Sequence, residues 1–207
     1  MILIQDNEHS EAFTMLESYE FCKPMLVVNN YFHKAPLQSH RENISYLIET
    51  SVEVSPQFKY DPIHLLHASQ DLEKLIEACY VLVKYIEDIE DNPSIIDEGE
   101  LRKPCLEKRL YIGWQAENSA WNCHPHNISD EEFINPYLAL ATFFDYQSFS
   151  KWKRTLHHIF EYSLSEPGLD CEKIRFKIDT LKVKELFMKI IEAAYLIDVR
   201  GNMTKVN

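Results

Sequence analysis

Two short clusters of histidine and cysteine in this chain have the residue types that bind metal ions. Cys123, His124 and His126 stand within the six residues 121–126, and His64 and His67 are three residues apart. Thiolate sulfur and imidazole nitrogen are ligands that zinc and other transition metals prefer. If the fold brings the two clusters together, these five side chains are the candidate ligands of a transition metal.

The spacing in both clusters differs from established metal motifs. The pair His64 and His67 lacks the glutamate of the zinc-protease helix, and the order Cys-His-Pro-His matches no common ligand spacing. The competing interpretation is a surface loop whose histidines are incidental. We therefore predict no cofactor and keep a metal-binding protein or enzyme, built on the connector loop, as an alternative.

An arginine and a histidine on one predicted helix suggest a second alternative. Arg154 and His158 resemble the R-x4–6-H signature of HEPN-type helical ribonucleases, although here only three residues intervene. The competing interpretation, which we favour, is a solvated arginine beside a partly buried histidine. An RNA-acting protein therefore remains an alternative function.

Two glutamates occupy matching places in two similar segments. Glu77 and Glu192 each follow a lysine by three residues, Lys74 and Lys189. A pair of carboxylates in a helical core can hold a metal or act in acid–base chemistry. Lysine and glutamate three apart on a helix more often form a solvated pair, and we favour that interpretation. No Ser-His-Asp motif, phosphate-binding loop or dinucleotide fingerprint is present, so no catalytic residue is predicted.

The matching segments belong to a longer internal repeat. Residues 72–82 and 187–197 share five of eleven positions, including the two glutamates. A second match, 112 residues apart, pairs the EFCKPML of residues 20–26 with the EFINPYL of residues 132–138. A tandem duplication explains both matches, and convergent amphipathic patterning is the alternative.

Each repeat predicts three helices. The first begins at Pro24 or at Pro136, because proline suits the first helical position, and Asn135 is a good N-cap for the second copy. The next helix begins near Ser39, which forms a capping box with Glu42.

The third helix of each repeat is the longest, and its apolar residues alternate at spacings of three and four. Ala78 and Ala193 are small residues on these helices, so we expect the two third helices to cross each other there. Gly201 is expected to close the second of them.

These helices predict an all-α fold made of two tandem three-helix units. Residues 1–87 are the first unit, residues 131–207 are the second, and residues 88–130 are an irregular connector, first acidic and then rich in Trp and His. A three-helix unit buries little apolar surface alone, so we expect both units to share one core around a pseudo-two-fold axis.

Composition excludes several classes of protein. The net charge is −12, and residues 87–100 hold seven acidic residues and no basic one, which makes nucleic-acid binding an unfavoured function. Five widely spaced cysteines without a C-x-x-C pair are typical of free thiols in a reducing compartment. No signal peptide or apolar run of about 20 residues appears, so we expect a cytoplasmic protein without a membrane span.

The second unit resembles a set of uncharacterised helical proteins from Bacteroidetes genomes. The resemblance covers about residues 131–197, more weakly residues 20–87, and implies a helical fold without an activity. It is carried by residues 135–138, 143–146 and 192–195, together with Trp152. With packing patterns and no catalytic constellation, the sequence predicts a protein-interaction or regulatory module. Its partner is then another protein or a second copy of the chain.

Overall fold

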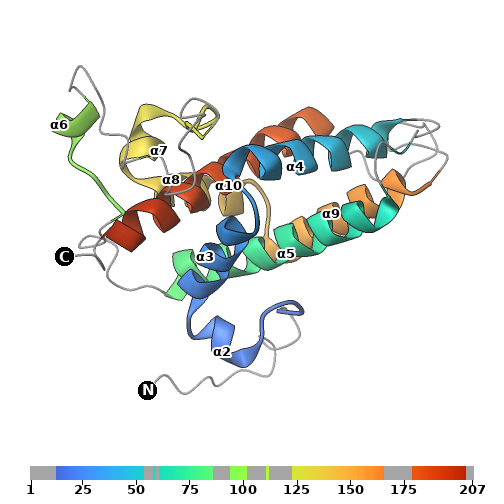
Figure 1. Ribbon diagram of the computed structural model, residues 1–207, viewed down its shortest axis with the longest axis horizontal. Coiled ribbons are helices and arrows are strands. Elements are labelled where there is room, and N and C mark those ends of the chain that lie inside the picture. Colours follow the sequence, from blue (N-terminus) through green and yellow to red (C-terminus); the bar gives the residue numbers. More distant parts are fainter. Residues whose placement is uncertain are drawn as a thin grey trace.

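A computed structural model describes residues 13–53, 58, 61–85, 94–101, 111, 123–165 and 179–203. All regular secondary structure in these ranges is helical (Figure 1), so the predicted all-α class is confirmed. The helices are α2 (Ser18–Phe21), α3 (Pro24–Lys34), α4 (Leu37–Val52), α5 (Pro62–Tyr85), α6 (Glu98–Leu101), α7 (Asp130–Ile134), α8 (Pro136–Tyr146), α9 (Phe149–Ser163) and α10 (Thr180–Met203).

Proline and side-chain caps fix where several helices begin. Pro24 and Pro136 occupy the first turns of α3 and α8, as predicted. The Asn135 side chain accepts a hydrogen bond from the backbone N–H of Tyr137 at 3.1 Å, which satisfies an amide that the first turn leaves unpaired.

Two predicted helix ends are wrong. Helix α4 begins at Leu37, directly after the extended Pro36, so Ser39 lies inside the first turn and does not cap it. Glu42 instead accepts a hydrogen bond from the Gln38 side chain at 2.8 Å. At the other end of the chain, α10 continues through Gly201 to Met203. In both places the neighbouring residues are good enough helix formers to extend the helix past the predicted signal.

Helices α4 and α9 pack against each other in the middle of the bundle. Helices α5 and α10 both pack on α3, α4 and α8, and they are not among the closely packed pairs of described helices. The predicted crossing of the two third helices is therefore wrong. Ala78 and Ala193 are fully buried, but they allow other helices, not each other, to approach.

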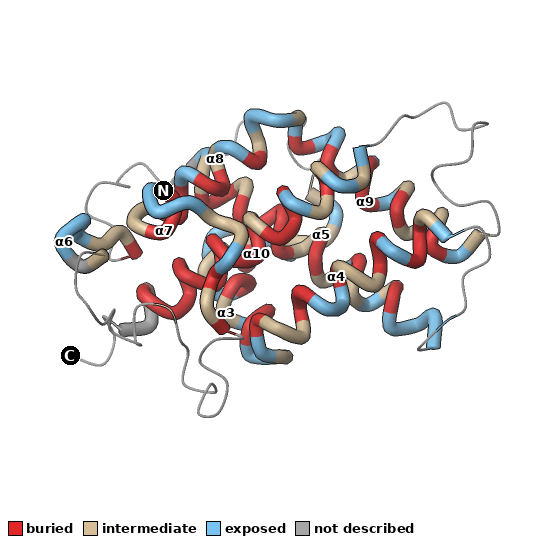
Figure 2. The backbone as a smooth tube through the Cα atoms, turned by 90° about the horizontal axis from the view of Figure 1, so that it is seen from above, coloured by how far each residue is buried: buried red, intermediate tan, exposed pale blue. Residues whose placement is uncertain are grey.

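Side chains from both predicted units belong to one buried apolar cluster. Ile44 and Leu75 of the first unit share it with Trp152 and Phe187 of the second. Figure 2 shows the buried positions lining the inner faces of α4, α5 and α10. The pseudo-two-fold relation between the units stays a prediction. Most of the predicted connector lies outside the described residues, and no described helix has the length and apolarity to cross a membrane.

Candidate functional site

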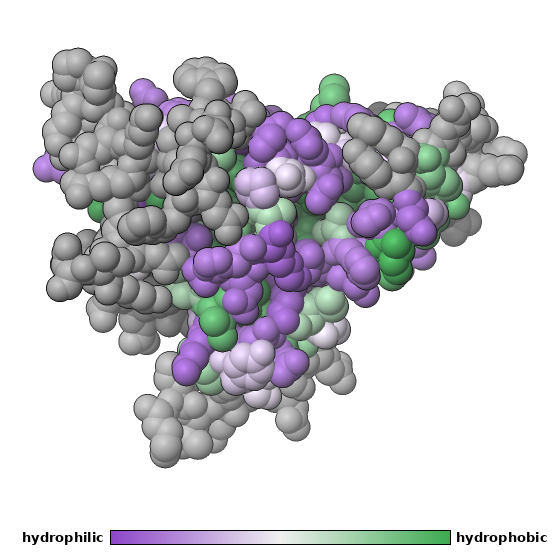
Figure 3. Space-filling view, viewed as in Figure 1, coloured by the Kyte–Doolittle hydropathy of each residue, from purple (hydrophilic) through white to green (hydrophobic). Residues whose placement is uncertain are grey.

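The largest cavity found among the described residues lies between α3, α4 and α5. Its volume is about 300 Å³, and polar and titratable side chains make up much of its wall. Figure 3 shows hydrophilic side chains gathered across the middle of the face that carries α3 and α5. The lining residues are Tyr31, Lys34, Ala35, His40, Asn43, Ile44, His64, His67, Ala68 and Asp71.

His40, on the first turns of α4, is the most deeply buried titratable side chain of this wall that carries an unsatisfied atom. Its residue is only 6% exposed, and its ring stacks on that of Tyr31 with 4.0 Å between the centroids. Backbone hydrogen bonds with Tyr31 and Ala35 hold one side of the imidazole, while burial lowers the pKa of His40 to about 4. The other nitrogen, Nε2, has no hydrogen-bond partner among the described residues. A neutral imidazole therefore presents an unsatisfied buried nitrogen at the cavity wall.

The second unit has tryptophan at the position 112 residues further along. Trp152 is fully buried and stacks on Phe143 at 3.9 Å, as His40 stacks on Tyr31. Its indole N–H donates to the backbone carbonyl of Phe143 at 2.8 Å, so its only polar atom is satisfied. Where the second unit packs a large indole, the first unit has a smaller imidazole beside an open cavity.

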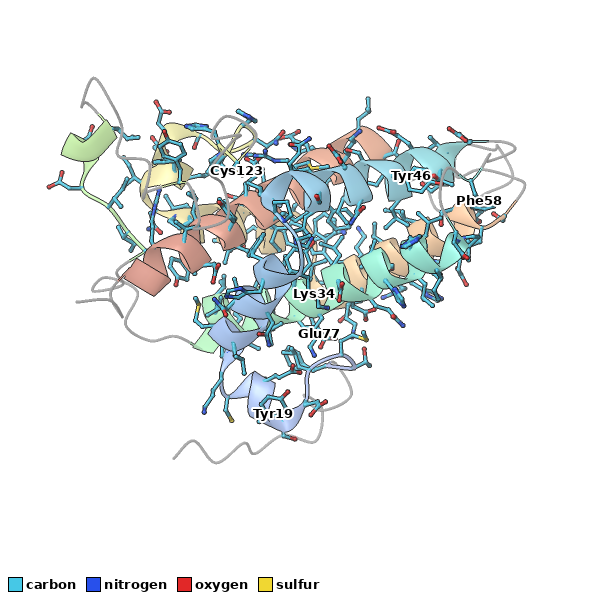
Figure 4. All side chains as sticks on the ribbon, viewed as in Figure 1. Tyr19, Lys34, Tyr46, Phe58, Glu77 and Cys123 are labelled. Carbon is cyan, nitrogen blue, oxygen red and sulfur yellow. The ribbon has the colours of Figure 1, made fainter. Side chains whose placement is uncertain are left out.

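An ion pair lies at the edge of this cavity. The Lys34 ammonium contacts Asp71 Oδ1 at 2.5 Å, and these side chains are 57% and 33% exposed (Lys34 is labelled in Figure 4). The negative charge of Asp71 raises the pKa values of Tyr31 and His40, although burial decides the net shift of His40. Asp71 therefore acts on both aromatic side chains of the wall.

A smaller cavity of about 120 Å³ lies on the far side of the same ion pair. It shares Tyr31, Lys34 and Asp71 with the larger cavity. Its outer wall carries a second ion pair, between Lys74 and Glu20 at 2.7 Å. The Lys34–Asp71 pair thus separates two polar hollows on one face of the first unit.

The five predicted metal ligands lie in two different places. His64 and His67, near the start of α5, line the His40 cavity. Cys123, His124 and His126 lie in the segment that leads into α7, away from Lys34 in Figure 4. Within the part of the chain that the structure describes, no three His, Cys, Asp or Glu side chains are grouped to hold a metal ion. Metal binding stays a prediction from sequence, and the geometry adds no support to it.

The segment that carries these three residues is attached to the bundle through its backbone. The Arg41 guanidinium donates to the carbonyl of His124 at 2.7 Å and to the Glu192 carboxylate at 2.5 Å. Glu192 also accepts the backbone N–H groups of His126 and Asn127, at 2.8 and 2.7 Å. Cys123 is buried here, and burial raises the pKa of its thiol.

Glu77 holds the other end of the chain in the same way. The backbone N–H groups of Thr14, Met15 and Leu16 all donate to its carboxylate, at 2.9–3.0 Å. Lys153, from α9, contacts Glu77 Oε1 at 2.6 Å. Both glutamates are fully buried, and each is neutralised by a cation from the other predicted unit.

The solvated lysine–glutamate pairs expected at these positions are therefore wrong. Lys74 contacts Glu20 at 2.7 Å, and Lys189 contacts Glu132 at 3.0 Å. A carboxylate that accepts several hydrogen bonds and a salt bridge is well satisfied in the core, so the structural role of these glutamates needs no solvent. Helical spacing places the glutamates three residues from the lysines, but it does not say which face is covered.

The predicted ribonuclease pair lies on the outer side of α9. Arg154 is exposed, and His158 is partly buried with Nδ1 at 3.3 Å from a carboxylate oxygen of Glu161. This matches the solvated arginine and partly buried histidine that we favoured. RNA binding stays untested.

His40 is the residue that motif reasoning missed. It belongs to no motif, and only the repeat offset sets it against Trp152. Comparison of the chain with protein-family models, with curated proteins and with solved structures finds no match in any of the three. The resemblance to the Bacteroidetes set likewise stays a prediction.

Proposed function

We propose that this chain is a regulatory binding protein, in which the first of two related helical units holds a small polar molecule in the His40 cavity. The carrying observation is the buried, unpartnered Nε2 at the wall of an open cavity of about 300 Å³. Leaving a buried polar nitrogen unsatisfied costs about 1–3 kcal/mol, which a bound ligand recovers. The volume is at the lower end of the range for small-molecule sites.

Paired contacts support the duplication within this proposal. Tyr31–His40 and Phe143–Trp152 are ring stacks whose members are 112 residues apart. Arg41–Glu192 and Lys153–Glu77 are ion pairs that cross between the units in opposite directions, and their cations are again 112 apart. On this proposal, one copy kept a packed aromatic interior and the other became a binding site.

The protein partner or homodimer expected from the sequence remains part of the proposal. Arg41 follows His40 directly on α4 and holds the segment of His124, so a molecule bound at His40 lies one residue from the contact that attaches this segment. A surface that changes with ligand binding is what a regulatory module presents to a partner.

The test is a fragment screen by protein-observed NMR on the whole chain, using small polar molecules and the variant His40→Trp. This variant fills the cavity with the side chain found in the second unit. We expect saturable shifts at lining residues in the wild type and none in the variant, whose melting temperature rises. The matched control is His157→Trp, at a side chain of α9 that is 66% exposed, and it should bind like the wild type.

Two results would overturn the proposal. The first is a wild-type protein that binds no fragment at these residues. The second is His40→Trp protein, folded by circular dichroism, that binds as well as the wild type. If His40→Trp does not fold, His40→Phe provides the same comparison, because phenylalanine has no nitrogen to accept a hydrogen bond.

A further inference from the structure

The hydrogen-bonding atoms of the His40 cavity restrict the chemistry of its ligand, an inference that rests on the proposed function. The backbone carbonyls of Tyr31 and Ala35 can only accept, so the imidazole nitrogen bonded to them carries the proton. In a neutral imidazole the remaining nitrogen, Nε2, is then an acceptor. A group that donates a hydrogen bond is therefore required to satisfy it.

Asp71 provides a second acceptor at the same cavity. An ionised carboxylate accepts hydrogen bonds and donates none. Its Oδ1 already accepts from Lys34, and a carboxylate has two oxygens that together accept several hydrogen bonds. Two acceptors from different helices, α4 and α5, therefore face a ligand that enters this cavity.

The second unit indicates the shape that such a wall accommodates. Trp152 lies with its ring plane 8° from that of Phe143 and 5.3 Å from the Phe187 ring centroid. The indole has a second fused ring that imidazole lacks. Tyr31 provides the corresponding ring face in the first unit, and Ile44 and Ala68 provide apolar wall. A flat ring is therefore the shape that the equivalent position packs.

We propose that the His40 cavity binds a planar nitrogen heterocycle that donates N–H hydrogen bonds to His40 Nε2 and to the Asp71 carboxylate. Amino-substituted purines, pyrimidines and benzimidazoles have this pattern of donors on a flat ring. The exposed Lys34 side chain at the edge of the cavity is placed to contact any substituent that leads outward from the ring.

The test uses 2-aminobenzimidazole and adenine as donor probes and 1-methylbenzimidazole as a probe of similar shape without an N–H group. Binding is measured by calorimetry and by NMR shifts in the full-length protein. We expect the donor probes to bind at the residues of the cavity and 1-methylbenzimidazole to bind at least about tenfold more weakly.

Asp71→Asn tests the carboxylate, and we expect it to weaken the donor probes about tenfold. The matched control is Glu49→Gln, which also removes an exposed carboxylate paired with a lysine, here Lys184 at 2.8 Å. Equal affinity for the methylated probe, or no effect of Asp71→Asn, would overturn the inference.

The two proposals fail separately. If other polar fragments bind at the cavity in a His40-dependent way and the heterocycles do not, the ligand class is wrong and the binding function stands. If no fragment binds there, both are wrong.

Discussion

At the scale of the residue, His40 is an expensive side chain to bury. Its neighbours hold it neutral at physiological pH, and its second nitrogen stays unsatisfied among the described residues. The second unit avoids this cost at the equivalent position with an indole whose single N–H is bonded. A protein that retains the costlier residue in one copy has a use for its free energy, and ligand binding is that use in our proposal.

The buried imidazole predicts a pH dependence of stability. Because the folded pKa of His40 is about 4 and the ordinary value is 6.5, the unfolded chain binds more protons between these pH values. The free energy of unfolding that His40 supports is therefore complete above about pH 6.5 and is lost as the pH falls towards 4. We expect a loss of about 2 kcal/mol between pH 7.5 and pH 5.

Urea unfolding of the wild type and His40→Phe at both pH values measures this loss. His64, His67, Lys34 and Asp71 line the same cavity and titrate in both proteins, so the difference between the two slopes isolates His40. The same slope in both proteins would contradict the prediction.

At the scale of the element, α4 and α9 each carry one cation that attaches a segment near the other predicted unit. Arg41 on α4 binds His124 and Glu192, and Lys153 on α9 binds Glu77. In each case the glutamate also accepts the backbone amides of that segment. Both arrangements use a buried carboxylate as a shared acceptor, so loss of the cation leaves that charge exposed to a low dielectric.

Hydrogen exchange tests these two attachments separately. Arg41→Ala is expected to increase exchange at the amides of His126 and Asn127 by at least about tenfold, because Glu192 loses its counter-charge. Lys153→Ala is expected to do so at Met15 and Leu16 instead. Each variant is the control for the other, and an increase at both segments in both variants would show general unfolding, not a local attachment.

At the scale of the whole molecule, the two predicted units share one interior. Helices α4 and α9 pack together, and α4 also packs on α10 while α5 packs on α9. The apolar cluster includes side chains of both units (Figure 2). Neither unit keeps its buried surface if the other unfolds, so we expect one cooperative transition.

Circular dichroism and tryptophan fluorescence should therefore report the same urea midpoint. Ile44→Ala in the first unit and Leu156→Ala in the second each remove a buried side chain from the shared core. Each should lower the free energy of unfolding by about 2–5 kcal/mol without separating the two signals. Two resolved transitions, one sensitive to each substitution, would show that the units fold independently.

The sequence alone was enough for the helical class, the two proline-started helices and the matching of the two halves. These depend on spacing along the chain, which determines which side chains share a helix face. It was not enough for the ends at Leu37 and Met203, because capping signals compete with neighbouring residues that also favour helix.

Only the tertiary structure decided which helices touch and which side chains lose contact with water. Glu77 reads as a surface residue from its lysine neighbour, yet segments far away in the chain bury it. His64 and His67 were predicted beside Cys123, whereas the fold places them beside His40. A cavity forms where helices from different parts of the chain meet, so its lining and its unsatisfied nitrogen have no signature in any local stretch of sequence.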